Sequence, residues 1–271
     1  MVIAYKETPV FYTDDGQGDV LVLLHGFLEN STMWVPFIPE LSKNNRVICI
    51  DILGHGKTGC TGYIHTMEEM ASAIHAVLVD LHIDSATIIG HSMGGYVGCA
   101  FAKAYPKKLK ALCLLNSTPL PDSPERKLLR KRANKMATES YSQLVRMSFT
   151  NLFNTKTRKD FEKEITQGLE EALQTPVQGY IAGNSGMSLR EDSSTIWKKG
   201  DFYKALLLGK DDWIIDSSAH KIAFGEQSDY FKIIPGGHMS HIGQMPIILK
   251  HLNQFIILIK NKDIKYAIVN D

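Results

Sequence analysis

The feature that most constrains the fold is a set of short, nearly continuous apolar runs in the first half of the chain. They cover residues 20–24, 46–50, 86–89 and 111–115. A strand with one exposed face alternates apolar and polar residues, whereas a strand buried on both faces is apolar throughout. Because parallel sheets are covered on both faces, these runs predict a mostly parallel central sheet.

Helical segments separate the apolar runs. Thr66 followed by Glu69 forms a capping box, which opens a helix that continues to Leu81. Residues 94–103 predict a second helix, and Pro106 follows it. Strands that alternate with helices form βαβ units, so we expect helices on both faces of the sheet. The fold class is therefore α/β.

The alternation stops after residue 117 and resumes near residue 200. The intervening block is predicted to be purely helical. Its first helix begins at Pro124, and Ser123 is the cap. Further helices are expected over 141–153, 157–173 and 177–189, then strands over 203–208 and 230–234 and a last helix over 246–259. We predict a core of residues 1–117 and 200–271 and a helical insertion of residues 118–199.

The charge balance bears on the class of partner. The 271 residues include 30 Lys+Arg and 29 Asp+Glu, which gives a net charge of +1. Affinity for nucleic acid or anionic membranes depends on excess positive charge, so we expect neither partner. Lys6 and Glu7 interrupt the N-terminal stretch, and the apolar run 255–259 is too short to span a bilayer. We expect a cytoplasmic protein.

The sharpest motif is Gly-His-Ser-Met-Gly at residues 90–94, placed directly between a predicted strand and a predicted helix. A strand that turns at once into a helix strains the central residue and leaves no room for side chains at the two glycines. Such a turn exposes the hydroxyl of Ser92 at the edge of the sheet. We predict that Ser92 is a nucleophile.

Three motifs follow predicted strands in the order typical of one family. They are His-Gly-Phe-Leu at 25–28, Asp-Ile-Leu-Gly-His-Gly at 51–56 and Gly-His-Ser-Met-Gly-Gly at 90–95. Together they resemble the α/β-hydrolase superfamily, and the length and helical block resemble its small capped bacterial serine esterases. The resemblance implies a mostly parallel sheet flanked by helices, with a helical cap inserted after the sixth strand.

The same resemblance implies the partners of the nucleophile, because a serine needs a base and the base needs an orienting acid. In this family the acid precedes the histidine in the chain. The Gly-x-x-Asp after the penultimate strand indicates Asp212, with Asp211 as the alternative. The Gly-His after the last strand indicates His238, with His241 as the competitor.

An oxyanion needs two preorganised donors. The backbone N–H of Met93, at the start of a helix, is one, and the resemblance assigns the N–H of Phe27 as the other. Trp34, Met187 and Trp213 are candidate residues of an apolar acyl pocket, although most such residues in helices belong to cores.

We expect no metal and no cofactor. His238 and His241 lie three residues apart, but no His-Glu-x-x-His motif or cysteine cluster accompanies them. The sequence also lacks the glycine-rich loops that hold nucleotides. The remaining histidines of the motifs are expected to shape loops, namely His25, His55 and His91.

The basic stretch from Arg126 to Lys135 has two interpretations. It could attract an anionic substrate or contact nucleic acid, or it could be the solvated face of a helix. We adopt the second, which predicts that Leu128, Leu129 and Met136 point inward.

These features predict a serine hydrolase that acts on an ester-like carbonyl of a small acyl substrate through an acyl-enzyme. Serine at position 92 disfavours the dehalogenase and epoxide hydrolase chemistries, which use aspartate there. Thioesterase, lactonase, carbon–carbon bond hydrolase, perhydrolase and acyltransferase remain open, because all of them use the same triad. A ligand-binding protein on this fold is the non-enzymatic alternative. Neither the substrate nor the oligomeric state is predicted.

Overall fold

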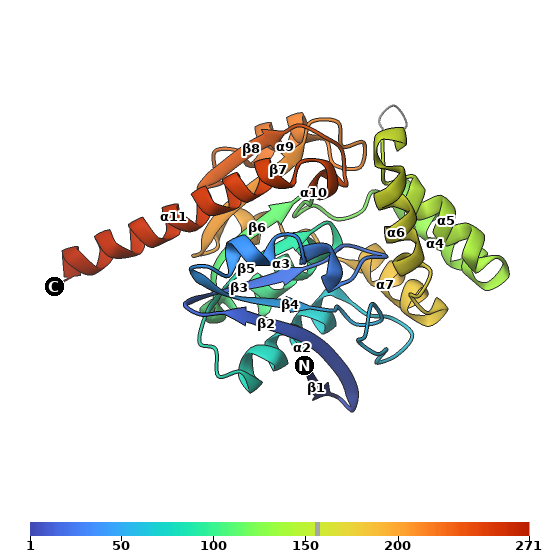
Figure 1. Ribbon diagram of the computed structural model, residues 1–271, viewed down its shortest axis with the longest axis horizontal. Coiled ribbons are helices and arrows are strands. Elements are labelled where there is room, and N and C mark those ends of the chain that lie inside the picture. Colours follow the sequence, from blue (N-terminus) through green and yellow to red (C-terminus); the bar gives the residue numbers. More distant parts are fainter. Residues whose placement is uncertain (155–157, 271) are drawn as a thin grey trace.

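The computed structural model describes residues 1–154 and 158–270, with side chains as far as residue 262. Its centre is an eight-stranded sheet of order β1-β2-β4-β3-β5-β6-β7-β8 (Figure 1). The strands are β1 (Val2–Tyr5), β2 (Thr8–Gly16), β3 (Asp19–Leu24), β4 (Asn45–Ile50), β5 (Ala86–His91), β6 (Leu109–Leu115), β7 (Tyr203–Gly209) and β8 (Tyr230–Ile234). Pairing from β4 through β3 to β8 is parallel, which confirms the predicted sheet.

The antiparallel edge was not predicted. β1 pairs with β2, and β2 pairs with β4, both antiparallel. These two strands are only partly buried, and β2 ends in Asp14, Asp15 and Gly16. They therefore lack the continuous apolar pattern that identified the central strands.

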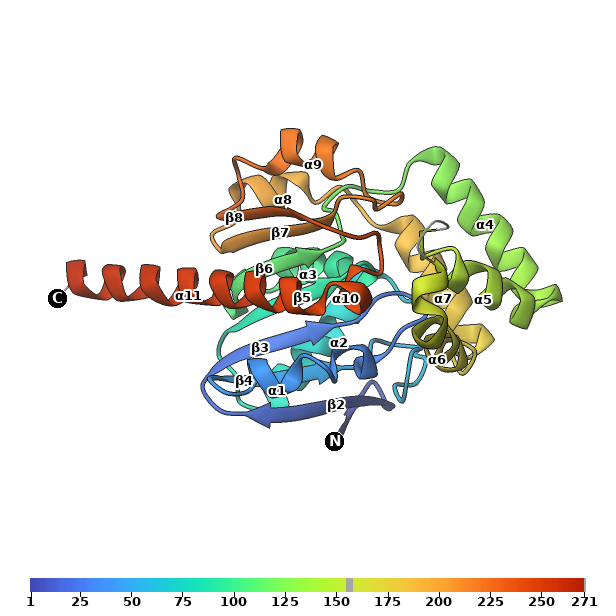
Figure 2. The same ribbon diagram turned by 45° about the horizontal axis from the view of Figure 1, so that its top comes forward.

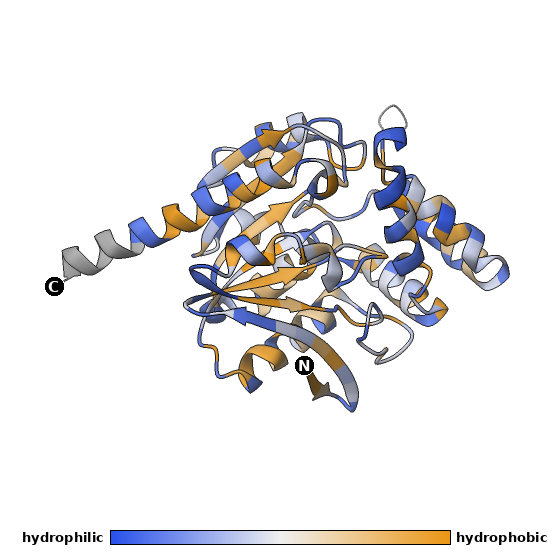
Figure 3. Cartoon of the chain, in the orientation of Figure 1, coloured by the Kyte–Doolittle hydropathy of each residue, from blue (hydrophilic) through white to orange (hydrophobic). Residues whose placement is uncertain are grey.

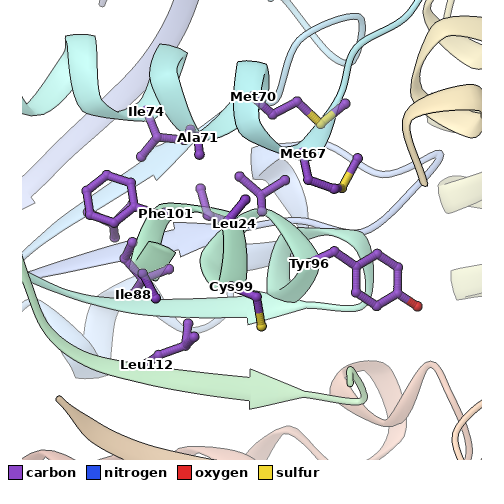
Figure 4. Packing of buried hydrophobic residues seen from close by; sticks show 14 of the residues in the cluster. Leu24, Met67, Met70, Ala71, Ile74, Ile88, Tyr96, Cys99, Phe101 and Leu112 are labelled. Atoms are coloured by element: carbon purple, nitrogen blue, oxygen red, sulfur yellow. The ribbon is translucent and has the colours of Figure 1, made fainter. Parts of the chain in front are cut away.

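Side chains of successive strand residues enter two separate cores. Val22 and Leu24 of β3 pack on one face of the sheet, whereas Leu21 and Leu23 pack on the other. The first face is covered by α2 (Met67–Asp80) and α3 (Met93–Ala104), as Figure 4 shows for Met70, Phe101 and their neighbours, with α8 (Ser194–Lys199) and α9 (Ser217–Phe224) beside them. Because side chains alternate between the two faces, both faces are apolar only if successive residues are apolar, and the central strands are largely orange along their length (Figure 3).

The second face is covered by α1 (Ile38–Leu41) and α11 (Met245–Asn270). Ile248, Leu252 and Phe255 of α11 are fully buried against the sheet. The helix then continues past the ends of the strands (Figure 1). Among the described residues, no helix is both long enough and apolar enough to pass through a membrane.

The predicted helical insertion lies between β6 and β7. It contains α4 (Pro124–Glu139), α5 (Tyr141–Thr150), α6 (Glu162–Ala172) and α7 (Val177–Leu189), followed by α8. Helices α4 to α7 gather beyond one end of the sheet (Figure 2) and share a core that includes Phe149 and Tyr180. Trp197 of α8 instead packs into the core beside α3. The first residue of the helix expected over 157–173 lies outside the described residues.

The prediction that Leu128, Leu129 and Met136 of α4 point inward agrees with the structure for Met136, which is partly buried against the core of the insertion, and is wrong for the two leucines. Leu128 and Leu129 are 47% and 60% exposed. The inner face carries Arg130 and Asn134, which hydrogen bond to Asn184 and Ser185 of α7. Hydrophobic periodicity misplaced the two leucines because part of the inner face of α4 packs on α7 through these polar contacts.

Candidate active site

Ser92 occupies the abrupt turn between β5 and α3. Its φ of 49° lies in the left-handed region, where residues other than glycine are strained. A Cβ at Gly90 would lie 2.4 Å from the backbone of Gly94, and one at Gly94 would lie 2.4 Å from the carbonyl oxygen of Leu24. The two glycines therefore allow strand and helix to approach closely enough to form this turn.

Ser92, His238 and Asp212 form a continuous hydrogen-bonded row at the ends of β5, β8 and β7. The Nε2 atom of His238 lies 2.9 Å from Oγ of Ser92, and its Nδ1 atom lies 2.9 Å from Oδ2 of Asp212. An ionised carboxylate only accepts hydrogen bonds, so Nδ1 carries the hydrogen and Nε2 can accept the serine proton. This is the arrangement that turns a serine hydroxyl into a nucleophile.

The carboxylate of Asp212 is buried but well satisfied. It accepts the backbone N–H groups of Ile214 and Ile215, at 2.8 and 3.0 Å, and the side-chain amide of Asn116 at 2.9 Å. Burial alone would raise the pKa of Asp212, but His238 and these hydrogen bonds lower it below its ordinary value. The acid is therefore ionised at neutral pH.

Asn116, at the end of β6, is a site residue that the sequence analysis missed. Besides Asp212, its amide donates to the carbonyl of Gly237 at 3.0 Å, and its Oδ1 accepts from Oγ of Ser240 at 2.7 Å. It therefore connects the acid to the loop that carries His238. Its position directly after a parallel strand, at the edge where the other site residues lie, is the signal that could have identified it.

The two pairs of alternatives left open by the sequence lie in different surroundings. Asp211 is exposed, whereas Asp212 is buried beside His238. His241 does not approach Ser92, because its Nε2 atom lies 3.2 Å from Oε1 of Glu29. The carboxylate of Asp212 and the imidazole of His238 are thus the two groups that the fold brings into a row with Ser92.

The two predicted amide donors border the same site. Phe27 follows β3, and Met93 is the first residue of α3, where backbone N–H groups attract negative charge. Within the described parts of the chain, neither N–H donates a hydrogen bond. Both therefore remain predicted donors to an oxygen atom of a ligand.

A small cavity of about 100 Å³ opens at Ser92 and His238. Its walls include Phe27, Met187 of α7 and, from α4, Arg126 and Arg130. Met187 is thus placed at the cavity, as the sequence analysis expected.

The two tryptophans named as pocket candidates lie elsewhere. Trp34 is fully buried on the α11 side of the sheet, where it packs against Phe37. Trp213 is 64% exposed and donates from Nε1 to the carbonyl of Asn151 at 3.0 Å. Neither is among the described residues that line the cavity, so this part of the prediction is corrected. A large aromatic residue alone does not distinguish core, surface and pocket.

A buried cluster of Glu29, His91 and His241 lies beside the turn that carries Ser92. Oε2 of Glu29 accepts the N–H of Gly26 at 2.7 Å and lies 2.7 Å from Nδ1 of His91, whose Nε2 lies 3.0 Å from the carbonyl of His238. Both nitrogens of His91 face acceptors, so both must carry hydrogen. Burial would lower the pKa of His91, but Glu29 and the His238 carbonyl raise it above its ordinary value.

The same three side chains offer an oxygen and two imidazole nitrogens within 4.8 Å of one another, a ligand set of the kind that binds zinc. The carboxylate of Glu29 already accepts hydrogen bonds from Gly26 and His91. Coordination of a metal would require His91 to lose its proton and these contacts to break. The cluster is therefore better described as an ion pair with its hydrogen bonds.

Comparisons with known proteins agree with this architecture. The sequence model of the alpha/beta hydrolase fold family matches residues 19–244. A putative 2-succinyl-6-hydroxy-2,4-cyclohexadiene-1-carboxylate synthase of Bacillus subtilis is 27% identical over 254 residues, or 88% of this chain and 90% of that protein. A 2-hydroxy-6-oxononadienedioate/2-hydroxy-6-oxononatrienedioate hydrolase of Paraburkholderia phymatum is 27% identical over 75% of this chain and 78% of its own. A thermophilic esterase from Thermogutta terrifontis superposes with a TM-score of 0.87 at 26% identity, covering 93% of this chain and 94% of that one.

Proposed function

The chain belongs to the α/β-hydrolase family and is a hydrolase of that fold, and on this premise we propose that it cleaves an ester-like carbonyl through an acyl-enzyme on Ser92. The observation that carries the proposal is the pair of 2.9 Å contacts that link Ser92 to His238 and His238 to Asp212. The solved esterase of similar fold supports the same substrate class.

In the first half of the reaction, Nε2 of His238 accepts the proton of the Ser92 hydroxyl while Oγ attacks the carbonyl carbon. The N–H groups of Phe27 and Met93 stabilise the oxyanion that forms, a contribution of roughly 10²–10³ in rate for each such donor. Asp212 stabilises the imidazolium, which then protonates the departing alcohol.

In the second half, a water molecule gives its proton to the neutral His238 and attacks the acyl carbonyl. The same two amides hold the second oxyanion, and the acid product leaves when Ser92 regains its proton from His238. Each proton that His238 accepts is returned within its own half-reaction, so the chemistry needs no cofactor.

We assign the recognition of the acyl group to the helical insertion, acting as a cap over the core. Residues 118–199 are proposed as this cap, over a core of residues 1–117 and 200–271. The support is that α4 and α7 supply Arg126, Arg130 and Met187 to the walls of the cavity at Ser92.

The same residues could act on thioesters, lactones or carbon–carbon bonds beside a carbonyl, or transfer the acyl group to an acceptor other than water. The relatives named above include a synthase and a hydrolase of a dienedioate, so acyl chemistry beyond simple esters belongs in the assay. A panel of esters, thioesters and lactones ranked by kcat/KM distinguishes these classes.

The experiment is the substitution Ser92→Ala, assayed on p-nitrophenyl acetate and butyrate. The variant is expected to fold with an unchanged thermal midpoint and to lose hydrolysis. Ser72→Ala, at a half-buried position on α2, is the matched control and should keep the wild-type rate. Hydrolysis by Ser92→Ala at the wild-type rate would refute the proposal.

A further inference from the structure

The cavity wall contributed by α4 carries an excess of positive charge. The carboxylate of Asp122, whose side chain is fully buried, faces three guanidinium groups. Nε of Arg130 lies 2.5 Å from Oδ2, Nη1 of Arg190 lies 2.7 Å from Oδ1, and Nε of Arg126 lies 3.6 Å from Oδ1. One carboxylate therefore faces three guanidinium groups, so the group of four side chains has a net charge of +2.

Two of the three arginines have further partners within the protein. Nη1 of Arg130 donates to Oδ1 of Asn184 at 2.9 Å. Nη1 of Arg190 donates to the carbonyl of Met187 at 2.8 Å, and its guanidinium lies 3.9 Å from the centre of the Tyr96 ring. These contacts fix both groups in place.

Arg126 differs from them. Its distance to Asp122 exceeds that of a hydrogen bond, and its guanidinium makes no hydrogen bond with any residue that the structure describes. The side chain is 35% exposed and lines the cavity that contains Ser92. Glu29 is the carboxylate among the described lining residues, and it already binds His91. The donors of Arg126 therefore remain available to a ligand.

We propose that Arg126, backed by Arg130, forms a subsite for a carboxylate carried by the substrate of Ser92. The planar guanidinium fork matches a carboxylate, and the surplus charge around Asp122 favours an anion at this wall. The enzyme then acts on acyl compounds that bear a free carboxylate, such as half-esters of short dicarboxylic acids. This inference rests on the proposed function for its catalytic part.

The kinetic test compares two esters that differ in one charge. They are mono-p-nitrophenyl adipate, which carries a free carboxylate, and the p-nitrophenyl ester of monomethyl adipate, which is neutral. After correction for uncatalysed hydrolysis, wild type should prefer the anion in kcat/KM by about 10- to 100-fold, the range of a charged hydrogen bond. Arg126→Gln should reduce the ratio to near one, and Arg126→Lys should retain part of it.

Lys127→Gln is the matched control, since Lys127 is the exposed neighbour of Arg126 on the same helix. It removes the same charge and should keep the wild-type ratio. Equal kcat/KM for the two esters in wild type, or an unchanged ratio in Arg126→Gln, would overturn the proposal.

A binding test separates this proposal from the catalytic one. Adipate should raise the thermal midpoint of Ser92→Ala, whereas the neutral adipamide should not, and adding Arg126→Gln should abolish the effect of adipate. If neither ester is hydrolysed, the proposed function fails, yet adipate binding still decides the subsite. If adipate does not raise the thermal midpoint of the Ser92→Ala variant, which still carries Arg126, the result contradicts the subsite. This holds even if the wild-type protein hydrolyses neutral esters.

Discussion

Glu29 and His91 form a buried ion pair beside the turn that carries Ser92, with 2.7 Å between Oε2 and Nδ1. Glu29 belongs to the loop after β3, and His91 is the last residue of β5. Through the carbonyl of His238, His91 also holds the loop after β8. One carboxylate thus connects the loop of the predicted oxyanion donor, the nucleophile turn and the histidine loop.

Glu29→Gln should lower the free energy of unfolding by about 3–5 kcal/mol at pH 6, because it leaves the buried charge of His91 without its partner. Urea unfolding of both proteins measures the difference. Glu40→Gln, on an exposed glutamate, is the control and should change stability by less than about 0.5 kcal/mol.

The pH dependence of this difference follows from the two pKa shifts. The pKa of Glu29 is well below the ordinary 4.5, because His91 and His241 outweigh the effect of burial, so its contribution is lost as the pH falls through that lowered value. The pKa of His91 is raised above the ordinary 6.5, so its contribution is lost as the pH rises through the raised value. The stability difference should therefore be largest between pH 4.5 and 6.5. A difference independent of pH would show that the two groups are not ionised as a pair.

Asp212→Asn should reduce kcat on p-nitrophenyl esters by about 10⁴, because an amide in place of the carboxylate favours the wrong tautomer of His238. The adjacent Asp211→Asn removes the same charge from an exposed position and should leave kcat within about twofold. The two variants measured side by side decide which aspartate is the acid. An equal loss in both, or a larger loss in Asp211→Asn, would contradict the assignment.

Gly94→Ala should destabilise the protein by about 1–3 kcal/mol or more, because the new Cβ would lie 2.4 Å from the carbonyl oxygen of Leu24. That oxygen belongs to the backbone of a buried strand and cannot move easily. Gly62→Ala is the control, since nothing lies within 4 Å of its Cβ and its φ is outside the left-handed region. A thermal midpoint of Gly94→Ala equal to that of Gly62→Ala would show that the turn does not require the glycine.

The central sheet and Ser92 could be predicted because their signals are local, whereas Asp212 and His238 were predicted from the resemblance of their motifs to those of the family. Strands such as β3 and β5 are buried on both faces, so their composition alone identifies them. The serine motif and the Gly-His and Gly-x-x-Asp motifs each follow a predicted strand. Because the strands are parallel, these motifs meet at one edge of the sheet.

What could not be predicted depends on contacts between segments far apart in the chain. Glu29 and His91 are 62 residues apart, and no periodic pattern links a loop carboxylate to a strand-end histidine. The exposed leucines of α4 were predicted to be buried because the apolar pattern of the helix favours them. The inward positions instead hold arginine and asparagine, and the arginine hydrogen bonds to Asp122 and Asn184. Such polar contacts become visible only once the partner helix is in place.

The most direct test of the account is labelling with a fluorophosphonate, which reacts with an activated serine. Intact-mass analysis of the folded wild-type protein should show one label per chain, peptide mapping should place it on Ser92, and Ser92→Ala should remain unlabelled. Folded wild-type protein that takes no label, or a label that persists in Ser92→Ala, would contradict the claim that His238 activates this hydroxyl.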